Sequence, residues 1–350
     1  MKPIRQKGQE MKKILRMGTG LLLVIMMSLG TGASAFAGSE VTKTAMPSWN
    51  ISDNERNDSI TKIGNNFVVE GNQTDFILPQ NANEKIKVNN KYGFSFELPD
   101  IAGNVNGTVT SKGEMVYNTK GNGKIVVTAL KQGQEGIIFD GLRTSIETKE
   151  KMGVQKYRYH YNLEPGQRLV TAKEYLGEDT GEVLIVGKEG DVAVIDPAMA
   201  MDSHGNNLQT HYEIGGDTLV QVVDVPKDGT ITVSSTTHPN KSESKYLTEK
   251  EVKAVIDGFT AGEKDMNKLS DVFSILGTTG EVMSALFDID AAWCRAQKAK
   301  YQSYYNQMNN TTKKYLKVTT TYRWRNGGKN SGYVPSGQTF ALVATKPTNA

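Results

Sequence analysis

The sequence predicts an α+β protein: an N-terminal all-β, sandwich-like body followed by a helical hairpin and a short C-terminal β-hairpin. Three observations predict this class. Residues 66–235 contain many short apolar runs with strand-like alternation, separated by Gly-containing turns. Residues 247–309 carry apolar residues three and four apart, which is helical spacing. Residues 315–325 then alternate again before a Gly-rich turn. A chain of 350 residues has room for two such domains.

Residues 1–37 are typical of a secretory signal peptide. A charged region precedes a short apolar run at Leu21 to Leu29, and we expect cleavage near Ala37. Met11 is an alternative start to Met1. A retained membrane anchor is the alternative interpretation, but the run is short for a span. We therefore expect a secreted, extracellular protein. The single cysteine, Cys294, excludes an intramolecular disulfide, which fits export from a Gram-positive cell.

The body is preceded by residues 38–65, which are polar, weakly patterned and expected to form a flexible leader. Strands are then predicted at intervals over residues 66–235. The stretch 156–161 alternates strictly, with three tyrosines on one face and Lys156, Arg158 and His160 on the other. Residues 182–196 and 208–223 each predict a hairpin around a Gly-containing turn. Residues 236–246 are rich in Ser, Thr, Asn and Lys and predict a linker.

Residues 247–350 predict a helical and β-hairpin module. Thr248 and Glu251 have the spacing of a capping box, so a helix begins there and continues to about Phe259. Residues 265–276 predict a second helix, and 281–309 the longest one. The strand at 315–325 places Val318, Thr320, Tyr322 and Trp324 on one face, and 339–344 returns beside it. Cys294 lies on an apolar helical stripe, where a buried small side chain is favoured over a reactive thiol.

Charge divides the chain unevenly. The last sixty residues contain ten basic and no acidic residues, whereas residues 38–290 hold 25 basic and 37 acidic ones. A cationic segment rich in aromatic side chains is drawn toward anionic polymers and membranes. The alternative is a solvated cationic face with tyrosines packed beneath it. The candidate envelope-binding residues are Lys313, Lys314, Lys317, Tyr322, Arg323, Trp324 and Arg325.

The segment before this tail predicts either a membrane-perturbing helix pair or an ordinary core. Its apolar runs contain no basic residue between Lys268 and Arg295, but Asp271, Glu281 and other acids interrupt them. Each acid is costly inside a bilayer, at about 2–3 kcal/mol. The candidate membrane-perturbing residues are Val272, Phe273, Leu276, Val282, Leu286, Phe287 and Trp293.

Motifs of catalysis and of metal or cofactor binding are missing from the sequence. None of the four histidines has zinc-protease spacing, and neither a nucleophile elbow nor a P-loop occurs. The turn Asp202–Asn206 matches only the start of a calcium loop. We therefore expect no enzyme, no metal and no cofactor, although distant residues can converge on a catalytic site without a local motif.

Several segments resemble known secreted proteins of bacilli: 166–170, 181–186, 194–198, 202–206 and 212–224. With 285–290 and 317–324, the layout is similar to the large geobacillin-like bacteriocins over about two thirds of the chain. One block runs here into Val233-Ser234-Ser235, where that group has a Val-Ala-Asp-Pro-type ending. The resemblance implies antibacterial activity, with an anionic bacterial membrane or teichoic acid and an immunity protein as partners, and no nucleic acid. The alternatives are a cell-wall-binding or envelope structural protein, and a secreted hydrolase.

Overall fold

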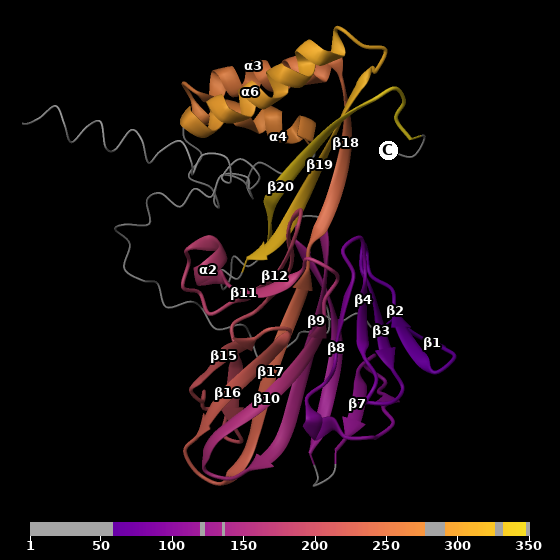
Figure 1. Cartoon of the computed structure of the whole chain (residues 1–350), viewed down its shortest axis with the longest axis vertical. Helices are drawn as coiled ribbons and strands as arrows, with labels where there is room; N and C mark the ends of the chain where they lie inside the picture. Colours follow the sequence, from indigo (N-terminus) through magenta and orange to yellow (C-terminus); the bar gives the residue numbers. More distant parts are fainter. Residues whose placement is uncertain (1–58, 120–122, 135–136, 277–290, 326–331, 348–350) are drawn as a thin grey trace, which may run out of the picture. The chain divides into compact units, whose positions relative to one another are not determined.

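The computed structural model describes residues 59–119, 123–134, 137–276, 291–325 and 332–347 (Figure 1). The chain divides into two compact units. The body unit comprises the described residues of Ser39–Lys241 together with those of Tyr322–Val334. The helical unit comprises the described residues of Ser242–Thr321 and Pro335–Ala350. The β-rich body that the sequence predicts is confirmed.

The first sheet of the body unit has eight antiparallel strands. Polar residues and turns separate short apolar runs, which gives strands of three to ten residues here. In spatial order they are β1 (Ile60–Ile63), β2 (Asn66–Val69), β3 (Asp75–Pro79), β4 (Ile86–Asn89), β5 (Phe94–Phe96), β10 (Gly153–Asn162), β16 (Thr218–Val225) and β15 (Thr210–Gly215).

The second sheet has nine strands, eight of them along one path. In spatial order they are β11 (Arg168–Thr171), β12 (Val183–Gly187), β13 (Gly190–Ile195), β17 (Gly229–Pro239), β9 (Ile137–Glu150), β8 (Lys124–Gln134), β7 (Met115–Asn118) and β6 (Thr108–Val109). β14 (Met199–Asp202) also pairs with β17. Two short helices lie in the body connections, η2 (Asp100–Ala102) and α2 (Ala172–Leu176).

The main core lies between the two sheets, as in a β-sandwich. Tyr157, Tyr159 and Tyr161 of β10 point into it, as the strict alternation of that strand predicts. Ile125 and Val127 of β8 and Ile146 of β9 contribute from the other sheet. Each side chain removed from water contributes about 1.5–3 kcal/mol, so this core dominates the stability of the body.

A second, smaller core covers the outer face of the nine-stranded sheet. β12 and β13 are buried on both faces: Val183, Ile185, Ala193 and Ile195 face the main core, and Leu184, Val186 and Val194 face the other way. Tyr322, Trp324 and Tyr333 complete the outer cluster. These three belong to a returning segment, which we define as Tyr322–Arg325 with Gly332–Val334.

The helical unit packs three helices around its own core. They are α3 (Glu249–Gly262), α4 (Ser270–Leu276) and α6 (Ala291–Met308), with the short η3 (Met266–Leu269) before α4. The capping box is confirmed: the Thr248 side chain accepts from the Glu251 amide, and the Glu251 carboxylate accepts from the Thr248 amide. β18 (Lys241–Thr248), β19 (Tyr315–Arg325) and β20 (Gly332–Val343) form a three-stranded sheet.

Two segments differ from their predicted conformations. Residues 236–246, expected to be a linker, lie in β17 and β18, and the division between the units falls among them at Lys241. Thr237, His238 and Asn240 are buried there, so the polar composition reflects internal hydrogen bonding, not solvation. β1 begins at Ile60, inside the expected leader. Residues 281–290 of the expected long helix and the turn at 326–330 lie outside the described residues.

Candidate functional site

The cations of the acid-free C-terminal segment divide between the two units. Arg323 and Arg325 belong to the body unit and seven others belong to the helical unit, while Lys329 lies outside the described residues. Residues 39–241 with 322–334 hold 23 basic and 27 acidic residues, a net charge of −4. Residues 242–321 with 335–350 hold 12 basic and 10 acidic residues, a net charge of +2. The charge separation between compact units is therefore weaker than the linear sequence indicates.

The exposed part of the predicted envelope-binding set is a lysine pair. Lys313 and Lys314 are exposed between α6 and β19. Within the described residues neither amine makes an ion pair or a hydrogen bond. Lys317 lies partly buried in β19, with its amine 5.8 Å from the centre of the Tyr246 ring. Two unpaired ammonium groups side by side can attract a polyanion.

The aromatic part of that set is buried in the body unit. Tyr322 and Trp324 point toward Val170, Leu184 and Val194 on the outer face of the sheet. The Trp324 ring stacks on the His238 ring, with centroids 4.1 Å apart and planes 13° apart. In this arrangement the two aromatic side chains contribute to the stability of the body and present little surface to a ligand.

Arg323 and Arg325 face body carboxylates. Arg323 lies 3.9 Å from Asp191 and Arg325 lies 3.7 Å from Glu178, in both cases between nitrogen and oxygen. Asp191 also accepts a hydrogen bond from the Asn240 side chain at 2.9 Å. The Arg325–Glu178 pair is partly exposed and contributes modestly to stability, whereas the Arg323 and Asp191 side chains are only 18% and 7% exposed. Together they hold the returning segment in register on the acidic body.

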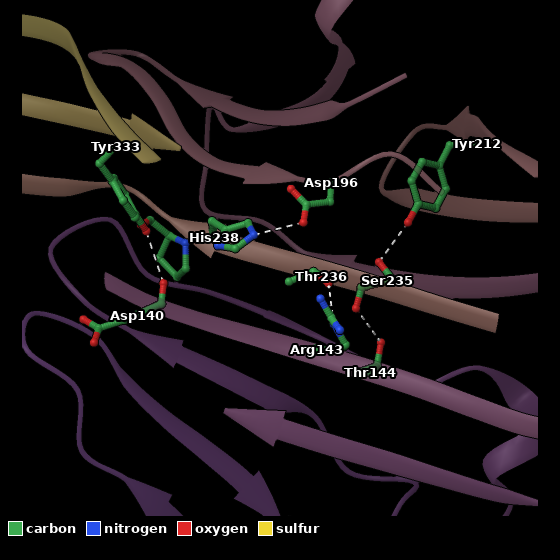
Figure 2. Close-up of polar contacts among 10 residues, drawn as sticks. Asp140, Arg143, Thr144, Asp196, Tyr212, Ser235, Thr236, His238 and Tyr333 are labelled. Atoms are coloured by element: carbon green, nitrogen blue, oxygen red, sulfur yellow. Dashed lines mark hydrogen bonds and ion pairs between the residues drawn. The ribbon is translucent and has the colours of Figure 1, made fainter. Parts of the chain in front are cut away.

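A buried polar network lies directly beneath Trp324. Figure 2 shows His238 of β17 and Asp196 pointing toward one another, with Nε2 and Oδ2 3.1 Å apart. Their side chains are 2% and 5% exposed. Gly141 packs so closely that an added Cβ would lie 3.1 Å from His238 Nδ1. The imidazole is thus enclosed on several sides, and it cannot reach a substrate in this arrangement.

Tyr333 ties the other part of the returning segment to two body strands. Its hydroxyl lies 3.1 Å from the Asp140 carbonyl oxygen and 2.6 Å from that of Pro239 (Figure 2). Burial, followed by the nearby Asp140 and Asp196 charges, raises the pKa of Tyr333 well above its ordinary value. The phenol therefore stays protonated and can donate. The buried Lys241 amine lies 5.8 Å from the Tyr333 ring centre.

Further polar contacts fix β17 beneath this network. Arg143 of β9 donates to the Thr236 hydroxyl at 3.1 Å, and Tyr212 donates to the Ser235 hydroxyl at 3.0 Å. The Thr144 hydroxyl donates to the Ser235 carbonyl oxygen at 3.4 Å. Buried polar groups that are paired in this way favour one arrangement over alternatives, because an unpaired buried group is costly.

The predicted membrane-perturbing residues have different positions. Val272, Phe273 and Leu276 are buried in the core of the helical unit. Trp293 lies in α6. Val282, Leu286 and Phe287 lie outside the described residues. Within the part of the chain that is described, no helix is long and apolar enough to span a membrane, and no three His, Cys, Asp or Glu side chains gather as metal ligands.

Comparison with protein-family models and with curated proteins finds no match to this chain. The resemblance to geobacillin-like bacteriocins therefore stays a prediction. The network around His238 was not predicted, because His238 lies in a polar segment whose composition predicts a linker. One signal was present: Val183–Val186 and Val192–Ile195 are apolar at every position. In an antiparallel sheet such runs indicate burial on both faces, although they do not identify the covering segment.

Proposed function

We propose that the protein is a secreted, bacteriocin-like antibacterial protein that acts at the anionic bacterial envelope without enzymatic chemistry. The observation that carries this proposal is the exposed pair Lys313 and Lys314 on a segment without acidic residues. Lipid headgroups and teichoic acids offer phosphates to which two adjacent ammonium groups are attracted. Lys317, at the start of the neighbouring strand, extends the same cationic end.

In this proposal the body restrains the remaining envelope-binding residues. Tyr322 and Trp324 are packed on the sheet, and Arg323 and Arg325 lie beside Asp191 and Glu178. They reach the envelope only after the returning segment leaves the body. The apolar helix residues, Val272, Phe273 and Leu276 among them, act at a later step, since they are now part of a core.

The test is dye release from anionic and neutral vesicles by the chain from Gly38 to Ala350, with killing of related bacilli measured in parallel. We expect release from anionic vesicles that is strongly reduced by the double substitution Lys313→Glu with Lys314→Glu. The matched control is Lys264→Glu with Lys268→Glu, an exposed lysine pair in the same unit. Equal loss in both double variants would show that only net charge matters. Release that is independent of lipid charge would refute the proposal.

A non-lethal wall-binding protein is the second candidate. The burial of Val272, Phe273 and Leu276 favours it, because these side chains already fill a core. This candidate predicts salt-sensitive binding to isolated cell walls through the same lysine pair, with no dye release and no killing.

A further inference from the structure

One end of the body carries two exposed apolar side chains. Met152 is 68% exposed and Val154 is 62% exposed, whereas the other large apolar side chains of their strand neighbourhood point into the core. Within the described residues only one other large hydrophobic side chain is comparably exposed, Ile63 at 58%, in the different setting of strand β1. Met152 lies in the turn between β9 and β10, and Val154 is the second residue of β10. This turn lies at the end of the body where β17 begins (Figure 1).

This turn is held in place by the neighbouring turn between β16 and β17. Gly153 pairs with Val225 and Glu150 with Gly229, so the two turns lie side by side. One Asp228 oxygen accepts from the Met152 amide at 2.8 Å, and the other accepts from the Lys151 amine at 2.8 Å. These hydrogen bonds lower the pKa of Asp228, which therefore stays ionised.

Local geometry directs the apolar side chains outward. Gly153 has φ of 121°, a conformation that favours glycine, and the space where its Cβ would lie is empty. The Gln155 side-chain Nε2 donates to the Lys151 carbonyl oxygen at 3.0 Å and closes the turn. These contacts fix the backbone from which the Met152 side chain projects into solvent, where it is 68% exposed. The exposure is a property of the turn itself.

The charges around the two side chains nearly balance. Lys149, Lys151 and Lys227 are exposed at this end, together with Asp224 and Asp228. Val154 lies directly opposite Asp224 on β16. Such an end is not a polyanion-binding surface. It combines an apolar centre with lysine amines at its margin, which is the arrangement that suits the boundary between lipid headgroups and acyl chains.

We propose that the β9–β10 turn inserts Met152 and Val154 shallowly into a lipid bilayer surface. Two side chains are too few for a stable protein interface, which takes about 800 Å² from each partner. A bilayer accepts a small convex apolar tip because it has no fixed shape to match. Contact through this turn depends on apolar insertion, so it differs in kind from attraction at Lys313 and Lys314.

The first experiment attaches an environment-sensitive fluorophore to Met152→Cys in the whole secreted chain. The native cysteine, Cys294, is fully buried, so labelling is selective. The matched control carries the fluorophore at Ile63→Cys. With both zwitterionic and anionic vesicles, we expect a blue shift at 152 and none at 63. Equal responses at the two positions, or no response at 152, would overturn the proposal.

The second experiment measures vesicle sedimentation by Met152→Asp with Val154→Asp against Ile63→Asp. Removing two inserted side chains should weaken binding to zwitterionic vesicles about tenfold or more, with little dependence on salt. Ile63→Asp should bind as the native chain does. Unchanged binding by the double variant would refute insertion. Lys313→Glu with Lys314→Glu leaves this turn intact, so a failure of the lysine proposal appears separately, as unchanged dye release by that double variant together with a retained fluorophore response at position 152.

Discussion

The two halves of β19 share one alternation but stabilise different units. Leu316 and Val318 pack in the core of the helical unit, whereas Tyr322 and Trp324 pack on the outer face of the body sheet. The pattern of buried and partly buried residues continues without a break through the strand. The comparison teaches that alternation defines the faces of a strand but does not identify what covers them.

The same comparison separates the cations that the sequence groups together. Lys313 and Lys314 precede the strand and stay in solvent, while Arg323 and Arg325 at its end lie beside carboxylates. A run without acidic residues is therefore compatible with two roles. Lys313 and Lys314 are available to a partner, whereas Arg323 and Arg325 balance negative charge on the body.

The largest expected effect comes from Trp324→Ala. It removes the ring stacked on His238 and opens a cavity over β12 and β13, at a cost of about 3–5 kcal/mol. Hydrogen exchange should accelerate in these two strands while α3 keeps its protection. Trp324→Phe, which retains a ring, should lose much less. Equal deprotection of α3 would contradict the assignment of the two halves of β19 to separate units.

A smaller effect is expected from Tyr333→Phe. The ring stays and only the hydroxyl near the Asp140 and Pro239 carbonyls is lost, so we expect about 1–3 kcal/mol less stability. Urea unfolding followed by circular dichroism measures the change. Tyr315→Phe is a control, since that side chain lies in the helical-unit half of β19. A larger loss of stability in Tyr315→Phe than in Tyr333→Phe would contradict this prediction.

Local patterns in the sequence predicted the elements better than their contacts. The limits of β19, the capping box at Thr248 and the inward tyrosines of β10 all follow from short-range spacing. The sequence predicts the first half of β17, but its second half and β18 were assigned to a linker, because the Ser, Asn, Lys and Pro residues there are typical of loops. Their hydrogen bonds go to partners about 90 residues away, such as Arg143 with Thr236.

The candidate site was predictable only in part, for the same reason. The exposed Lys313 and Lys314 follow from composition and a turn signal. The stacking of Trp324 on His238 joins residues 86 positions apart, and no periodicity encodes that contact. The exposure of Met152 could not be predicted from the sequence either, because a methionine beside a turn is typical of an ordinary strand end. Its exposure depends on Asp228 from a separate turn.

Thr248→Ala tests the separation of the two units by weakening the helical unit instead of the body. It removes the side-chain oxygen that accepts from the Glu251 amide, and caps of this kind contribute about 1 kcal/mol. Exchange should accelerate in α3 while β12 and β13 keep their protection, the reverse of the result for Trp324→Ala. Thr248→Ser, which keeps the oxygen, should behave as the native chain does. Loss of protection in both units would mean that they unfold together.

The smallest expected effect is that of Arg323→Ala. Its partner Asp191 keeps the hydrogen bond from Asn240, so removing the guanidinium should destabilise the body by about 1 kcal/mol at most. The loss should shrink at high salt, because screening weakens the pair in the native chain as well. Lys313→Ala, which removes an amine without such a partner, should leave stability unchanged at any salt concentration. If the two variants were equally neutral at low salt, Arg323 would behave as a solvated cation, and the two ends of the acid-free segment would differ only in their aromatic packing.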